Sequence, residues 1–234
     1  MHAYPSPLKN GTQIANTARL QSSPSSPASH TWGGARNFKQ NASEHLSLEQ
    51  CQRLIRAFNN SEKLGLPFNR HWTVHYEKAG VAEENATQFI GRLLKLVREY
   101  AGRHQKPFSC IWVREGGVKH GGHVHILMHL PPELSLRGRI RKWIRLAGGT
   151  SKRKVSKIAS VGGRLNSSAA TTHHKQNAQA VVGYLLKCAS EAAGLKLGLS
   201  RFGVRATIAG KRCGYSQNLG RRTTLHEAGC FPFK

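Results

Sequence analysis

Two histidines at alternate positions are the feature of this chain with the clearest chemical potential. His123 and His125 flank Val124 in a short run rich in apolar residues. A β-strand has a side-chain period of two, so both imidazoles point to one face while Val124 points to the other. Two neighbouring imidazoles can bind one divalent cation. The pair predicts a metal site, although so short a motif also arises by chance.

A carboxylate upstream is expected to complete this site. Glu115 ends an apolar run at 108–115, and the pairs Gly116-Gly117 and Gly121-Gly122 separate this run from the histidines. This punctuation predicts a β-hairpin, which brings Glu115 beside both imidazoles. One carboxylate and two imidazoles leave coordination positions open, as in catalytic metal sites. The alternative is that Glu115 is a solvated residue at the mouth of the hairpin.

A tyrosine further along the chain is the candidate nucleophile. Tyr184 and Lys187 are three positions apart in a segment expected to be helical, so they share a face. A tyrosine can act as a covalent nucleophile when its phenolate is stabilised, and a divalent cation with a nearby ammonium supplies that help. The alternative is an amphipathic tyrosine in the core with a lysine reaching to solvent.

These residues need a sheet to hold the ligands and a helix to carry the tyrosine. Alternating apolar residues predict strands, and apolar spacings of three and four predict helices. Strands are expected at 71–77, 108–115 and 123–130, and a weaker one at 154–161. Helices are expected after the capping-box sequence Ser47–Gln50 and at 84–102, 134–146 and 175–192. The order predicts an α+β fold whose central antiparallel sheet has helices packed on one face and the site on the other, with the histidine strand central.

Composition divides the chain into three parts. Residues 1–44 are rich in Ser, Pro, Asn, Gly and Ala and are expected to form a disordered leader. Residues 45–195 contain the periodic apolar segments and are expected to form the single folded domain. Residues 196–234 are basic and punctuated by glycine, and are expected to form a C-terminal tail.

The charge of the chain points to a polyanionic partner. The chain has 36 Lys and Arg against 11 acids, a formal net charge of +25, so nucleic acid is the leading candidate. All the acids are glutamate, which disfavours two-metal sites built on several aspartates. Backbone contacts to DNA are expected from the basic helix near 134–146 and the basic run that follows it: Arg137, Arg139, Arg141, Lys142, Arg145, Lys152, Arg153 and Lys154.

Cysteine usage and hydropathy bear on the compartment. The five cysteines are scattered and form no Cys-x-x-Cys pair, which argues against a zinc ribbon and a disulfide framework. A reducing cytoplasm fits this pattern. We expect no membrane association, because no apolar run approaches the length of a membrane span and the N-terminus lacks an apolar signal core.

Glu115, then the His123-Val124-His125 strand, then Tyr184 and Lys187 on a later helix resembles the HUH endonucleases, and most of all their single-tyrosine rolling-circle replication initiators (Rep proteins). The resemblance covers about residues 70–190 and implies a sheet of about five strands. It implies that Glu115, His123 and His125 bind Mg²⁺ or Mn²⁺ and that Lys187 assists. It also implies that Tyr184 attacks single-stranded DNA at an origin or hairpin, leaving a 5′-phosphotyrosine and a free 3′-hydroxyl.

Two alternatives remain open. A single-tyrosine HUH transposase has a similar histidine motif, but such enzymes usually place a polar ligand four residues after the tyrosine, where this chain has Cys188. A non-enzymatic basic nucleic-acid-binding protein explains the charge but not the candidate site. The chain also lacks a Gly-x-x-x-x-Gly-Lys-Ser/Thr motif, so an initiator of this kind would take a host helicase as its partner.

Overall fold

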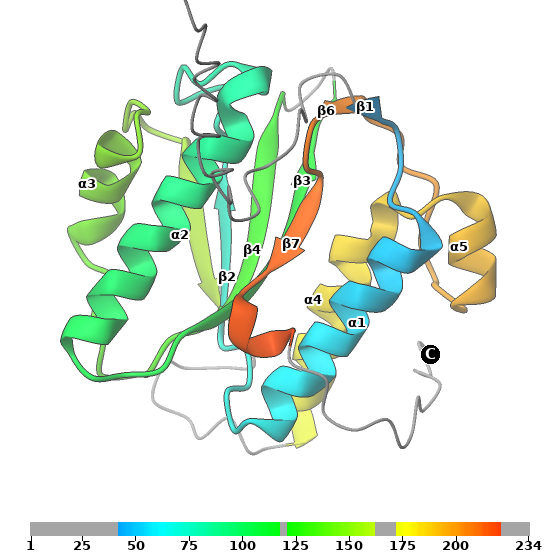
Figure 1. Ribbon diagram of the computed structural model, residues 1–234, viewed down its shortest axis with the longest axis horizontal. Helices are drawn as coiled ribbons and strands as arrows, with labels where there is room; N and C mark the ends of the chain where they lie inside the picture. Colours follow the sequence, from blue (N-terminus) through cyan, green and yellow to red (C-terminus); the bar gives the residue numbers. More distant parts are fainter. Residues whose placement is uncertain (1–41, 118–120, 162–171, 221–234) are drawn as a thin grey trace, which may run out of the picture. The chain divides into compact units, whose positions relative to one another are not determined.

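An antiparallel sheet of five strands organises the molecule. We describe residues 42–117, 121–161 and 172–220 of a computed structural model; of the leader expected over 1–44, residues 1–41 lie outside this part. The strands stand in the order β5-β2-β4-β3-β7, and every neighbouring pair is antiparallel (Figure 1). Their bounds are β2 Arg70–Val74, β3 Ser109–Glu115, β4 His123–His129, β5 Ser156–Ser160 and β7 Cys213–Tyr215. The predicted α+β class, antiparallel sheet and central histidine strand are confirmed.

The outer strand β7 comes from the segment expected to be a tail. It pairs with β3, so that Ile111 lies opposite Tyr215 and Trp112 lies opposite Gly214. Gly214 is required here, because a Cβ at this position would come within 2.8 Å of the Trp112 ring. The predicted end of the domain at residue 195 is therefore too early. A further two-stranded pairing joins β1 (Ala42–Ser43) to β6 (Ile208–Ala209). Within the described residues, regular structure therefore begins at Ala42, before the boundary predicted at residue 44.

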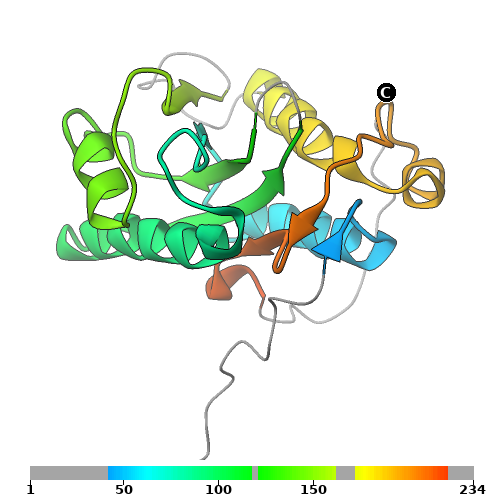
Figure 2. The same cartoon turned by 90° about the horizontal axis from the view of Figure 1, so that it is seen from above.

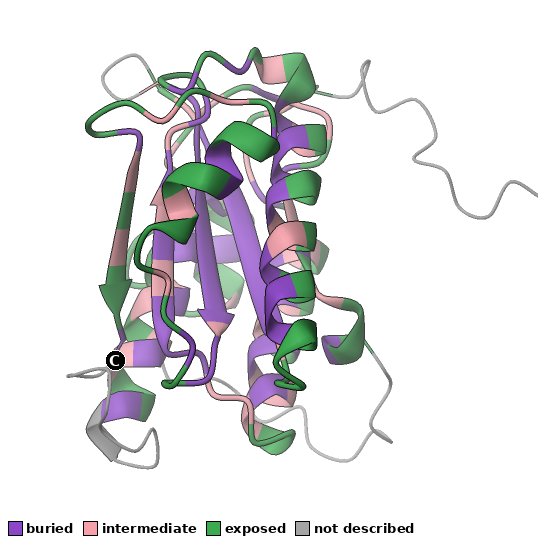
Figure 3. Ribbon diagram, turned by 90° about the vertical axis from the view of Figure 1, so that its left-hand side faces the viewer, coloured by how far each residue is buried: buried purple, intermediate pink, exposed green. Residues whose placement is uncertain are grey.

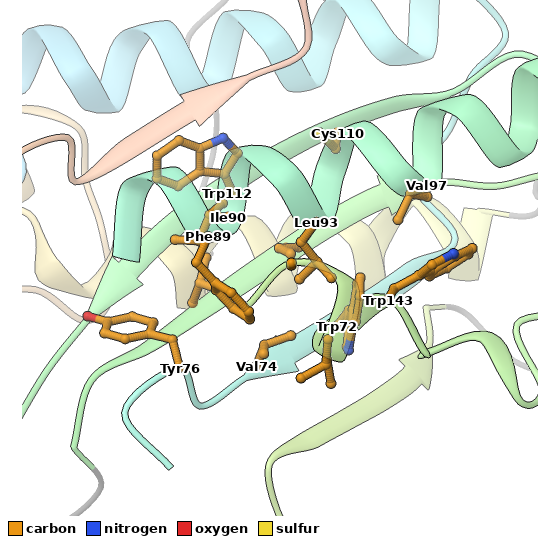
Figure 4. Close-up of a cluster of buried hydrophobic side chains, with 14 of the residues drawn as sticks. Trp72, Val74, Tyr76, Phe89, Ile90, Leu93, Val97, Cys110, Trp112 and Trp143 are labelled. Atoms are coloured by element: carbon orange, nitrogen blue, oxygen red, sulfur yellow. The ribbon is translucent and has the colours of Figure 1, made fainter. Parts of the chain in front are cut away.

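One face of the sheet packs against α2 (Ala86–Arg103) and α3 (Arg139–Leu146). The strands contribute Trp72 and Val74 to this core, and α2 contributes Phe89 and Leu93 (Figure 4). The α2 side chains recur at spacings of three and four, which places them on one stripe of the helix. Burial of each such large apolar side chain contributes about 1.5–3 kcal/mol. This apolar layer therefore holds α2 and α3 against the sheet.

Helices also cover the opposite face, whereas the sequence led us to expect them on one face only. α1 (Leu48–Lys63) and α4 (Thr172–Leu185) pack here around Ile111, Val113 and Leu127 of the sheet. Figure 2 shows helices on both sides of the strands. The physical reason is that β3 is buried at every position, so both of its faces need apolar cover.

Helix boundaries follow local chemistry. α1 begins at the predicted capping box, in which the Gln50 amide donates to Ser47 Oγ and the Ser47 amide donates to Gln50 Oε1. α3 starts at Arg139 rather than near 134, after Gly138 in a left-handed conformation. The predicted helix over 175–192 is divided into α4, the 3₁₀ turn η3 (Leu186–Cys188) and α5 (Glu191–Lys196). This change of winding directs Lys187 into the interior, where it is buried.

A candidate metal centre beside an exposed tyrosine

The register of the central hairpin places the three candidate ligands together. Glu115 at the end of β3 lies directly opposite His123 at the start of β4, and His125 follows on the same side. Glu115 Oε2 is 3.4 Å from His123 Nε2 and 3.5 Å from His125 Nε2. All three side chains are buried. The hairpin therefore forms as predicted, and Glu115 at its mouth is a buried carboxylate beside two imidazoles and not a solvated residue.

Neighbouring groups fix the direction of both imidazoles. The carbonyl oxygen of Gly121 lies 2.9 Å from His123 Nδ1, which leaves Nε2 facing Glu115. Nδ1 of His125 lies 3.0 Å from Thr73 Oγ1 and 3.1 Å from His71 Nε2, both on β2. Because a carbonyl oxygen can only accept, His123 Nδ1 donates to it and His123 Nε2 carries a free lone pair. The two partners of His125 Nδ1 orient its ring so that Nε2 faces Glu115.

The geometry of the cluster fits a metal ion. One ligand atom from each of the three side chains lies within 4.8 Å of the others. Metal–ligand bonds of about 2.0–2.2 Å place neighbouring ligand atoms roughly 3.0–3.5 Å apart, and both distances from Glu115 Oε2 to an imidazole Nε2 match this spacing. His125 Nε2 is buried and has no hydrogen-bond partner among the described residues. A bound cation would satisfy this nitrogen, so the Glu115, His123 and His125 cluster can hold a metal.

Charges around Glu115 keep it ionised. Burial acts to raise its pKa, but the contacts with His123 and His125 and the ammonium of Lys187 outweigh burial and hold the pKa well below its usual range. Lys187 Nζ lies 2.5 Å from Oε1, so the second oxygen, Oε2, remains directed at the imidazoles. Burial also lowers the pKa of His125. The cluster therefore presents an anionic Glu115 carboxylate and a neutral His125 imidazole, the protonation states that bind metals.

Tyr184 lies beside this cluster at the end of α4. Its ring centroid is 5.3 Å from that of His125 and 6.3 Å from that of His71. Lys187 Nζ is 3.5 Å from the centre of the Tyr184 ring, so one ammonium contacts both the tyrosine and Glu115. Tyr184 is 40% exposed, in contrast to the buried ligands. The structure thus brings together all five residues expected from the sequence and leaves the tyrosine open to solvent.

The other described tyrosines are not placed for this role. Tyr76 is buried on the α2 face, where its hydroxyl donates to Glu83 Oε2 at 2.6 Å, and burial raises its pKa. Tyr100 belongs to the same core, on α2. Tyr215 pairs with Ile111, which is four residues, or about 13 Å of strand, from Glu115. Tyr4 lies outside the described residues.

The basic residues expected to bind DNA divide between two regions. All eight are exposed. The five in and just before α3 (Arg137, Arg139, Arg141, Lys142 and Arg145) lie on the side of the sheet opposite to the metal centre. Lys152, Arg153 and Lys154 precede the edge strand β5, which is largely exposed (Figure 3). None of these residues contributes to the cluster around Glu115.

Sequence reasoning missed three residues near the site. His71 and Thr73 support His125, and Lys157 on β5 lies opposite Thr73 and faces the same side. Burial lowers the pKa of His71 to about 4, with further lowering by His125 and the nearby lysines, so this imidazole is neutral. The sequence pattern could have identified His71 and Thr73, because the alternation of side chains along 71–77 puts both on the face opposite Trp72.

Comparison with protein-family models, with curated proteins and with solved structures finds no match to this chain. Across the part of the chain that the structure describes, no helix has both the length and the apolar character needed to cross a membrane.

Proposed function

We propose that this protein is a metal-dependent endonuclease and strand transferase that nicks and joins single-stranded DNA through Tyr184. The observation that carries the proposal is the position of Lys187, whose ammonium lies 2.5 Å from Glu115 Oε1 and 3.5 Å from the centre of the Tyr184 ring. The Lys187 ammonium therefore contacts both the exposed candidate nucleophile, Tyr184, and the buried candidate ligand Glu115. If Tyr184 were a core residue, its side chain would not be exposed. If the metal site were purely structural, it would not need an exposed tyrosine beside it.

The proposed reaction is a transesterification. The Tyr184 phenol oxygen attacks phosphorus, the bond from phosphorus to the 3′ oxygen breaks, and a 5′-phosphotyrosine forms. The phenol loses one proton and the leaving 3′ oxygen takes one up, so the step is balanced. Lys187 stabilises the negative charge that develops on the phenol oxygen. Attack of a 3′-hydroxyl on the phosphotyrosine reverses the step and joins the strands.

Glu115, His123 and His125 would hold the divalent cation, Mg²⁺ or Mn²⁺. The mixed set of one carboxylate and two imidazoles suits Mn²⁺ well, and Mg²⁺ is the more oxygen-preferring alternative. When bound, the ion supplies Lewis-acid polarisation of the scissile phosphate. The protein's own contribution is to orient the ligands through Thr73 and the Gly121 carbonyl.

We assign the DNA chemistry to initiation of rolling-circle replication of a plasmid or phage at an origin or hairpin, in the cytoplasm and with a host helicase. Cys188 supports an initiator over a transposase. It occupies the position four residues after the tyrosine, is fully buried, and burial raises the pKa of its thiol to about 11. A buried neutral thiol is a poor metal ligand. Lys157, exposed on the metal side of β5, is suited to contact the DNA backbone there.

A covalent-adduct assay tests the proposal. The full chain is incubated with Mn²⁺ and a pool of single-stranded oligonucleotides, with and without hairpins, labelled at the 3′ end. Because the protein keeps the 5′ phosphate, the label should migrate with the protein on a denaturing gel. Tyr184→Phe should abolish this band, whereas Tyr215→Phe, the matched control, should retain it.

Peptide mapping then locates the attached nucleotide. A nucleotide on the Tyr184 peptide supports the proposal, and one on the Tyr215 peptide contradicts it. If the wild-type chain binds the oligonucleotides but forms no adduct with either Mn²⁺ or Mg²⁺, the protein is a basic nucleic-acid-binding protein and not an enzyme of this class.

A further inference from the structure

A second group of positive side chains lines a groove on the face of the sheet opposite to the metal centre. The groove, of about 900 Å³, lies between α3, the segment 132–138 and strands β2 and β5; Figure 3 faces this side of the molecule. Arg70, Arg137 and Arg141 border it. Side chains alternate along β2, so Arg70 shares the side of Trp72, while His71 points to the metal centre.

Arg70 is the least usual of these side chains. It is 5% exposed, and its Nη1 donates to the Asn69 carbonyl oxygen at 2.8 Å. No carboxylate of the described residues forms an ion pair with it, and Glu133, the acid in the groove lining, pairs instead with Lys106 at 2.6 Å. Burial lowers the pKa of Arg70. A buried cation without a counter-ion is costly, which indicates that an anion completes the groove.

The start of α3 points to the same conclusion. Its N-cap is Gly138, which offers no side chain to accept hydrogen bonds from the first amides, and the first turn contains no acid. Arg139 and Arg141 instead place positive charge at the positive end of the helix dipole, an unfavourable arrangement for an isolated helix. An anion bound in the groove accepts from free amides of this turn and neutralises Arg141, which borders the groove.

We propose that this groove binds the phosphate of a nucleotide, held by Arg70, Arg137, Arg141 and the amides at the start of α3. Arginine forks match phosphate oxygens in geometry and charge. Leu136, Ile140 and Ile158 also line the groove and provide apolar surface for the sugar or base. The nucleotide is either free or a unit of a DNA strand. This site lies across the sheet from Tyr184 and does not depend on the nicking reaction.

The test compares two arginines of the same helix. Arg141 lines the groove, whereas Arg145 is also exposed on α3 but is not part of the lining. Arg141→Ser and Arg145→Ser therefore remove the same charge from the same element. Binding of dAMP is measured by titration calorimetry, and binding of fluorescein-labelled dT12 by anisotropy. Both use the full chain in EDTA, so that the metal centre does not contribute.

We expect Arg141→Ser to weaken binding of at least one probe about tenfold or more, the effect of one charge-assisted hydrogen bond. Arg145→Ser should change the affinity for dAMP by less than about twofold, and should weaken dT12 binding less than Arg141→Ser does, because Arg145 does not border the groove. Arg70→Met should act like Arg141→Ser if its circular dichroism shows a folded protein. An effect on dAMP identifies a site for free nucleotides, and an effect on dT12 alone identifies a contact to a DNA strand. If Arg141→Ser and Arg145→Ser match each other with both probes, the groove does not bind phosphate.

Discussion

Removal of the ammonium that contacts both Glu115 and Tyr184 should destabilise the metal-free protein. Lys187→Met keeps a long flexible side chain but leaves the Glu115 carboxylate without its closest cation, 2.5 Å away. Both side chains are more than nine-tenths buried, and loss of one member of a buried pair typically costs about 3–5 kcal/mol. We expect about 3 kcal/mol, the lower end of that range, because His123 and His125 still contact the other carboxylate oxygen.

Urea unfolding followed by tryptophan fluorescence measures this loss, since Trp72 and Trp143 are buried in the core. A cost of about 3 kcal/mol lowers Tm by roughly 6–12 °C in a chain of this size. Saturating Mn²⁺ should stabilise Lys187→Met more than wild type, because the ion then neutralises an otherwise unpaired carboxylate.

A double-mutant cycle separates the ion pair from the lost packing. In a Glu115→Gln background, Lys187→Met should cost less than about 1 kcal/mol, because no buried anion remains. An equal cost in both backgrounds, or a Tm for Lys187→Met equal to that of wild type in EDTA, would refute the assignment of Lys187 as the partner of Glu115.

Three further results are expected. His125→Ala should abolish the covalent adduct while oligonucleotide affinity stays within about twofold by anisotropy, since phosphate contacts supply affinity; adduct formation at the wild-type rate would exclude His125 as a ligand. The folded-state pKa of Glu115 lies below its unfolded value of about 4.3. Its contribution to the free energy of unfolding is therefore complete above about pH 5 and declines as pH falls toward the folded pKa. Urea titrations in EDTA should show this decline in wild type but not in Glu115→Gln, and parallel curves would argue against it. Arg153→Glu with Lys154→Glu should reduce the slope of log affinity against log salt by about one unit per lost phosphate contact; an unchanged slope would place DNA elsewhere.

The ligand set was predictable because it depends on local rules. Glu115 and His123 lie on consecutive strands, and the short connection between them, which contains glycine pairs, favours a hairpin in which these two residues pair. The period of two then fixes which side chains share a face. The Tyr184 position also follows from helical spacing, but the inward turn of Lys187 does not, because it needs the change from α4 to η3.

Features that depend on distant parts of the chain were not predictable in this way. β7 has only three residues, and its pairing with β3 is specified by the Trp112 ring against Gly214 and not by a strong strand pattern. The cover on both faces of the sheet was indicated in part by the apolar run 108–115, which has no polar alternation. Tertiary packing decides which helix covers which face of the sheet, and the local secondary-structure propensities of the residues do not predict it.

The pairing of β3 with β7 makes the order of synthesis matter for the metal centre. Arg114, next to Glu115, donates to the Lys211 carbonyl, 97 positions further along the chain. At about 5–20 residues per second, roughly 5–20 s pass between synthesis of these two positions. During that interval the strand bearing Glu115 has an unpaired edge, which is open to pairing with other chains. The ligand strand therefore gains its outer neighbour only after residues 213–215 have been synthesised, and a chain that stops before residue 213 exposes an unpaired strand edge in its place.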